Sequence, residues 1–73
     1  MRYDFLVMKG NEYLMALAEI EGKVLPIFTI YKYDAARLER RADAYRVKRK
    51  LQRPDEQWRL VAFNWATGEV KPA

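Results

Sequence analysis

The side chains able to do chemistry in this sequence are hydroxyls and carboxylates, because it contains no histidine, cysteine or serine. Nucleophilic catalysis needs an activated nucleophile beside a base. The only aliphatic hydroxyls, Thr29 and Thr67, have no candidate base nearby in the sequence. Without cysteine or histidine, disulfides and the commonest metal ligands are also missing. We therefore expect no catalytic residues, no metal site and no cofactor.

The carboxylates do not form a catalytic pattern either. Glu39 and Asp43 are four residues apart and have arginine neighbours, which is typical of ion pairs on a solvated helix face. The glycines, Gly10, Gly22 and Gly68, are too far apart for a phosphate-binding loop. The sequence therefore predicts a protein that binds a partner and is not an enzyme.

The basic residues are concentrated in one segment, residues 37–53. Eight of them stand there against two acids, a net charge of +6, whereas six bases and eight acids give the rest of the chain −2. Segregated charge of this kind indicates a surface for an acidic partner. The eight are Arg37, Arg40, Arg41, Arg46, Lys48, Arg49, Lys50 and Arg53.

Two strands are predicted in the first half of the chain. Residues 2–8 and 24–33 are rich in aromatic and β-branched side chains. Pro26 cannot donate a backbone hydrogen bond, which places the second strand at a sheet edge or a bulge. Residues 12–21 between them are ambiguous, because they contain good helix formers and only one β-branched residue.

Turn residues on both sides of 12–21 are compatible with either interpretation. Asn11 and Gly22 would cap a helix at its start and end. The pairs Gly10-Asn11 and Gly22-Lys23 also fit two-residue hairpin turns. We favour the hairpins, and hence a three-stranded meander.

A helix is predicted from an N-cap at Asp34 to about Gln52, because no glycine or proline intervenes before Pro54. Its second half alternates basic and apolar residues, so a strand over 45–52 is the competing interpretation. Propensity favours the helix. The apolar stripe expected to pack on the sheet is Ala35, Leu38, Ala42 and Tyr45.

The last section predicts a hairpin. Residues 57–65 form a strand by composition, residues 66–68 a loop, and residues 69–71 a short final strand. Trp58 and Trp65 are expected to anchor the helix, although their odd spacing places them on opposite faces. The predicted architecture is one α+β domain over residues 1–73, with the order β-β-β-α-β-β over an antiparallel sheet and β-α-β-α-β as the alternative.

The opposite face of the predicted helix is expected to bind the partner. It carries a small apolar strip with cations at its rim. The predicted partner-binding residues are Arg37, Arg40, Arg41, Ala44, Val47, Lys48 and Leu51.

Three interpretations of this face stay open. In the first, it binds an acidic protein, a nucleoprotein or a second copy of the chain as a homodimer. In the second, its cations follow a nucleic-acid backbone without sequence specificity. Bases would then stack on aromatic residues of the sheet. In the third, the helix has no partner, and Val47 and Leu51 cap the core. The candidate stacking residues are Tyr31, Tyr33, Phe63 and Trp65.

No targeting or membrane segment is expected. Asp4 falls where a signal peptide would place apolar residues, and the longest uncharged runs are far shorter than the roughly 18 residues of a spanning helix. We expect a cytoplasmic protein that does not contact membranes.

Overall fold

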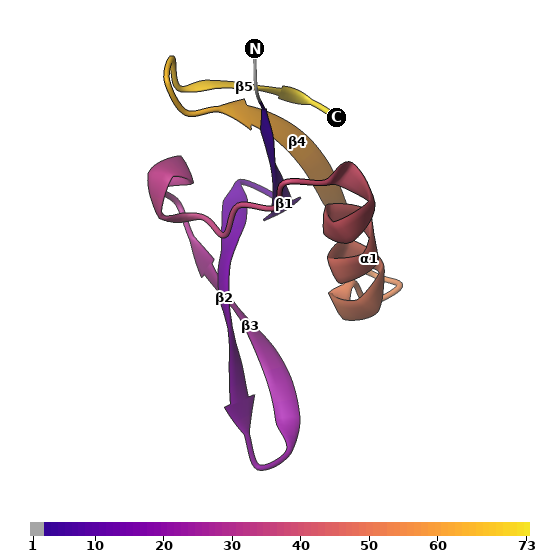
Figure 1. Cartoon of the computed structure of the whole chain (residues 1–73). Coiled ribbons are helices and arrows are strands. Elements are labelled where there is room, and N and C mark those ends of the chain that lie inside the picture. Colours follow the sequence, from indigo (N-terminus) through magenta and orange to yellow (C-terminus); the bar gives the residue numbers. More distant parts are fainter. Residues whose placement is uncertain (1–2) are drawn as a thin grey trace.

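The computed structural model describes residues 3–73, so Arg2, at the start of the first predicted strand, lies outside the described residues. The described chain is α+β, with the predicted order of strands and helix (Figure 1). Residues 12–20 form a strand, which confirms the meander and excludes the β-α-β-α-β alternative. The elements are β1 (Asp4–Lys9), β2 (Glu12–Ile20), β3 (Lys23–Thr29), the 3-10 turn η1 (Lys32–Asp34), α1 (Arg41–Leu51), β4 (Trp58–Asn64) and β5 (Glu69–Pro72).

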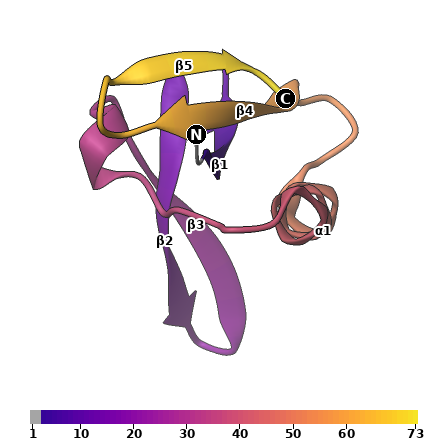
Figure 2. The ribbon, with the colours of Figure 1, turned by 45° about the horizontal axis from the view of Figure 1, so that its top comes forward.

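The five strands form one antiparallel sheet in the order β3-β2-β1-β4-β5. β1 pairs with β4 along its whole length. It pairs with β2 only next to their turn, at Met8↔Tyr13 and Lys9↔Glu12. Beyond that point β2 and β3 leave the sheet as a two-stranded ribbon that projects from the body (Figures 1 and 2). We call residues 15–27 the arm and the rest of the described chain the body.

The gap that opens between β1 and β2 is filled by an extended segment. Phe5 and Leu38 exchange two backbone hydrogen bonds, of 2.7 and 3.0 Å. On the other side, the N–H of Ala36 donates to the carbonyl of Leu14 at 2.9 Å. The segment thus satisfies backbone groups that the diverging strands leave unpaired, as buried backbone requires.

This segment is why the helix starts later than the sequence predicts. The predicted helix begins after Asp34, but Asp34 belongs to η1 and α1 begins at Arg41. The N–H groups of Ala36 and Leu38 are used by strands, so the intervening residues cannot form helical hydrogen bonds. The helical interpretation of residues 45–51 is confirmed.

The core consists of two clusters on opposite sides of β1. Leu6 and Met8 point to one side and Val7 to the other, as the two-residue period of a strand requires. α1 covers only the Val7 side. The first cluster is Leu6, Met8, Ala35, Val61 and Phe63, and the second is Val7, Leu14, Ala44, Trp58 and Leu60.

α1 turns toward the sheet the face that was predicted to point outward. Ala44 is fully buried, and Val47 and Leu51 pack on the second cluster. Ala42 and Tyr45, which were predicted to contact the sheet, are exposed. The predicted orientation of the helix is therefore wrong.

The error comes from the late start of the helix. Ala35 and Leu38 reach the core as predicted, but from the extended segment and not from a helix. They therefore carry no information about helical phase. Read from Arg41 onward, the spacing i, i+3, i+7 of the buried residues is an ordinary helical stripe.

The turns differ in detail from the prediction. Strand 24–33 ends at Thr29, and strand 57–65 ends at Asn64. The second hairpin turn is Glu21–Gly22, not Gly22-Lys23, and both of its residues have positive φ, of 51° and 76°. Positive φ at both central positions is the geometry of a type I′ turn, which suits the twist of a two-stranded ribbon.

Candidate functional site

The predicted partner-binding residues do not form one surface. Three of them, Ala44, Val47 and Leu51, face the core, so the predicted outward apolar strip does not exist. This agrees with the interpretation in which the helix caps the core. The four predicted cations remain at least partly exposed, but they lie on two separate parts of the chain.

Arg37 lies in the extended segment and stacks on an aromatic ring. Its guanidinium carbon is 3.4 Å from the centroid of the Trp65 ring, within cation–π distance. Trp65 also contacts Tyr33, with ring centroids 6.4 Å apart. Arg37 therefore fixes the extended segment to the β4–β5 turn. Trp65 contacts this segment, whereas Trp58 packs in the cluster under α1 as predicted.

The outward face of α1 is basic and has an exposed tyrosine. Residues 41–53 hold six bases and one acid, Asp43, a net charge of +5. Asp43 pairs with Arg46 at 3.6 Å, whereas Glu39 precedes α1 and so does not share its face. Tyr45 is 45% exposed. The last turn is rich in cations, which stabilises the negative end of the helix.

Both threonine hydroxyls are engaged in turns. The Thr29 hydroxyl accepts from the N–H of Tyr31 at 3.1 Å, and that of Thr67 accepts from the N–H of Glu69 at 3.3 Å. Among residues 3–73, no group of three or more histidine, cysteine, aspartate or glutamate residues is arranged to hold a metal ion. Of the aromatic residues proposed to stack bases, Phe63 is fully buried and unavailable.

The arm carries the largest group of exposed apolar side chains in the described chain, and sequence reasoning missed it. Cross-strand partners lie on the same face of a ribbon, and successive pairs on opposite faces. The pairs Leu17↔Pro26 and Ala18↔Leu25 therefore make both faces of the arm apolar. The exposed side chains, 37–56% accessible, are Met15, Leu17, Ile20, Val24, Leu25 and Ile27.

The β3 edge of the arm is unsuited to adding another strand. β3 is an outer strand of the sheet, and its centre is Pro26. Proline has no N–H, and within sheets it is confined to positions whose nitrogen faces away from the neighbouring strand. It thus removes a donor from the middle of the edge and blunts it. The side-chain faces of the arm are therefore better suited to binding than its β3 edge.

A groove of about 420 Å³ lies between β3 and the end of α1. Its wall on the arm is apolar, and its other side is Leu51 with Trp58 behind it. Lys50 and Arg53 lie at its margin. The apolar lining residues are Val24, Leu25, Pro26, Phe28, Leu51 and Trp58.

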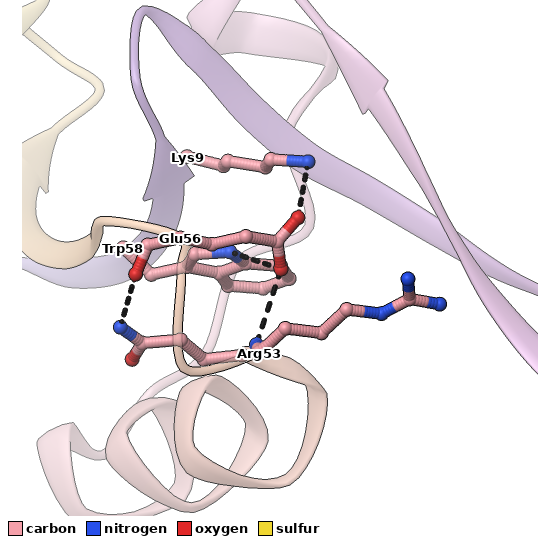
Figure 3. A network of polar contacts seen from close by, with 5 residues as sticks. Lys9, Arg53, Glu56 and Trp58 are labelled. Carbon is pink, nitrogen blue, oxygen red and sulfur yellow. Dashed lines mark hydrogen bonds and ion pairs between the residues drawn. The ribbon is translucent and has the colours of Figure 1, made fainter.

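A polar network fixes the base of this groove (Figure 3). One carboxylate oxygen of Glu56 pairs with the ammonium of Lys9 at 2.6 Å. The other accepts from the backbone N–H of Arg53 at 3.1 Å and from the indole N–H of Trp58 at 3.3 Å. The hydrogen bond from Lys9, together with that from the Arg53 backbone, lowers the pKa of Glu56 below its usual value. The network joins β1, β4 and the end of α1.

One signal in the sequence did point to the arm. A hairpin with one buried face alternates apolar and polar residues. Residues 13–18 and 24–31 contain no charge and do not alternate. Such a pattern predicts strands covered on both faces, yet within residues 3–73 nothing covers the arm.

No helix within residues 3–73 has the length and apolar character needed to cross a membrane. Comparisons of the chain with protein-family models, with curated proteins and with solved structures found no match.

Proposed function

We propose that this chain is a small, non-enzymatic interaction module that binds a protein surface through the β2–β3 arm. The observation that supports it most is the exposure of large apolar side chains on both faces of the arm, such as Leu17 at 53% and Leu25 at 41%. Folded monomers rarely expose contiguous apolar patches of this kind, and those that do usually have a binding site there.

The low stability expected of the arm by itself also supports a partner that covers it. An isolated two-stranded ribbon is marginal in water. Leu14 and Phe28 flank the arm and pack in the second cluster, whereas among the described residues the support of the arm itself comes from its own strand pairing and turn. Burying the remaining half of a leucine or isoleucine contributes about 0.8–1.5 kcal/mol. A partner that covers both faces therefore stabilises the arm as it binds.

The basic face of α1 sets the charge of that partner. With a net charge of +5 over residues 41–53, it attracts acidic surfaces over several ångströms. Charge of this kind mainly raises the rate of association and selects partners, while the buried apolar residues supply the affinity. We therefore expect the partner surface to combine apolar side chains with acids.

Site-specific photocrosslinking tests the proposal. A photoreactive phenylalanine analogue is placed at position 17 or 25, on the two faces of the arm, or at the exposed Thr67 as a control. Irradiation of cells that make the full chain should give a covalent protein adduct from positions 17 and 25 and none from position 67. Failure to form a protein adduct at either arm position would rule out the proposed function.

A second candidate, nonspecific nucleic-acid binding, is favoured by the outward face of α1. Arg41, Arg46 and Arg49 stand there around the exposed Tyr45. Phosphate contacts by such a face predict an affinity that falls steeply with salt. The test is a mobility shift with duplex DNA and single-stranded RNA between 20 and 200 mM salt, with R46E/R49E as the charge-reversed variant. No shift at the lowest salt removes this candidate.

A further inference from the structure

We infer that the partner of the arm is a second copy of this chain, with the two arms packed face to face and the tip of each in the groove of the other. The inference depends on the proposed function, since it names the protein that the arm binds. It is carried by the charge of the tip, by the lining of the groove and by the small size of the chain.

Charge is distributed along the arm as this arrangement requires. Its charged residues, Glu19, Glu21 and Lys23, lie within two residues of the turn, so the tip is acidic and the shaft uncharged. The groove has a mixed lining whose charge is opposite to that of the tip, because Lys9, Lys50 and Arg53 outnumber its one acid, Glu56. The acidic tip of one arm therefore matches the basic margin of another copy's groove.

The groove cannot be filled by the tip of its own arm. Its wall is the β3 half of that arm as far as Val24, and the tip continues outward from that wall to the free end of the ribbon (Figure 1). The tip of a second copy's arm can occupy it, because each chain supplies one groove and one tip. Such self-complementarity is what an interface with two-fold symmetry demands.

The small size of the chain also supports the inference of a second copy. A chain of 73 residues buries only about 60% of its unfolded surface, and domains of this size often gain stability by oligomerisation. The chain has no cysteine for disulfides. Among the described residues, all of the buried apolar side chains lie in the body, so the arm adds almost nothing to the core of one copy. Pairing two arms would give them a core of their own.

The test is sedimentation equilibrium of the full chain with paired charge reversals. The chain should sediment at twice its 8.7 kDa mass. E19K/E21K makes tip and groove both basic, and K50E/R53E makes both acidic, so each alone should self-associate on the order of tenfold or more weakly. An equimolar mixture of the two variants should recover the dimer, because each tip then meets a groove of opposite charge.

A matched control separates these effects from net charge. R59E/K71E changes the charge by the same amount as K50E/R53E, but at exposed residues of β4 and β5 that lie outside the basic segment and do not line the groove, and should leave the dimer intact. Circular dichroism confirms that each variant is folded. A mixture that stays monomeric, or a control that dissociates as fully as K50E/R53E, would overturn the inference.

The photocrosslinking adducts distinguish this inference from the proposed function. An adduct of twice the chain mass from positions 17 and 25 supports both. A chain that is monomeric up to high micromolar concentration, with adducts of another mass, overturns the second copy while the arm still binds protein. No adduct at all, together with a monomer, removes both.

Discussion

The body and the arm are built from similar residues but differ in what covers them. In the body, β1 sends Leu6 and Val7 to opposite sides, and both are almost completely buried by β4, α1 and the extended segment. In the arm, Leu17 and Leu25 also lie on opposite faces, and both are about half exposed. Apolar composition therefore produces a core only where another element lies within reach.

The two regions also differ in how their elements are held in place. The end of α1 is fixed by the Glu56 network, and the extended segment by the stacking of Arg37 on Trp65. Within residues 3–73, the arm is held by its strand pairing and its turn. The contrast shows that side-chain contacts between distant elements hold the body in place to a greater extent than the arm.

The difference in burial between body and arm is tested most directly by removing one apolar side chain from each region. Phe63→Ala should lower the free energy of unfolding by about 3–5 kcal/mol, because Phe63 is fully buried. Ile27→Ala, at 40% exposure in the arm, should lower it by less than about 1 kcal/mol in the monomer. Urea unfolding followed by tryptophan fluorescence at low protein concentration measures both. Equal losses would contradict the division into body and arm.

Two alanines of α1 test which face of the helix belongs to the body. Ala44→Leu should cost about 1–3 kcal/mol, since Ala44 is fully buried and an added side chain has no space. Ala42→Leu, two residues away and exposed, should change the free energy of unfolding by less than about 0.5 kcal/mol. Thermal unfolding followed by circular dichroism compares them. If Ala42→Leu were the more damaging variant, the helix would be turned the other way.

Gly68 and Gly10 lie in two turns of the body, one packed against a side chain and one with open space around it. Gly68→Ala should cost about 1–2 kcal/mol for its φ of 79°, and more because its Cβ would lie 2.9 Å from the Tyr33 hydroxyl. Gly10→Ala has a similar φ of 58° and no atom within 4 Å, so it should show the backbone cost alone. Urea midpoints of the two variants give the difference. Identical midpoints would show that Tyr33 can move aside freely.

The smallest expected effect concerns the pH dependence of stability and the Glu56 network at the base of the groove. Because the pKa of Glu56 is lowered in the folded chain, its ionised form stabilises the fold at neutral pH. That contribution is lost as the pH falls through the lowered pKa. Glu56→Gln should therefore flatten the fall in stability between pH 6 and pH 3 relative to the unmodified chain. Asp55→Asn, an exposed neighbour, is the control for loss of one charge, and an equal flattening there would contradict the role of Lys9.

Local patterns in the sequence predicted much of the body. The strands, the meander over residues 12–20, the final hairpin and the helical state of residues 45–51 all follow from propensity and turn residues. The burial of Trp58 under α1 was also predicted. These features depend on neighbours within a few residues, which is the range over which sequence patterns carry information.

Only the tertiary structure decided where the helix begins, which side of it is buried and where an apolar surface is left open. The late start depends on Phe5, which takes the backbone of Leu38 into the sheet from 33 residues away in the sequence. That pairing set the phase of α1 and moved Val47 and Leu51 from the predicted partner surface into the core. The exposure of the arm likewise depends on how far β2 follows β1. Composition by itself determined that the chain lacks cysteine and histidine and carries its positive charge in one segment. Contacts between distant segments decided which surfaces are buried and which are exposed, because burial depends on what lies opposite a side chain in space.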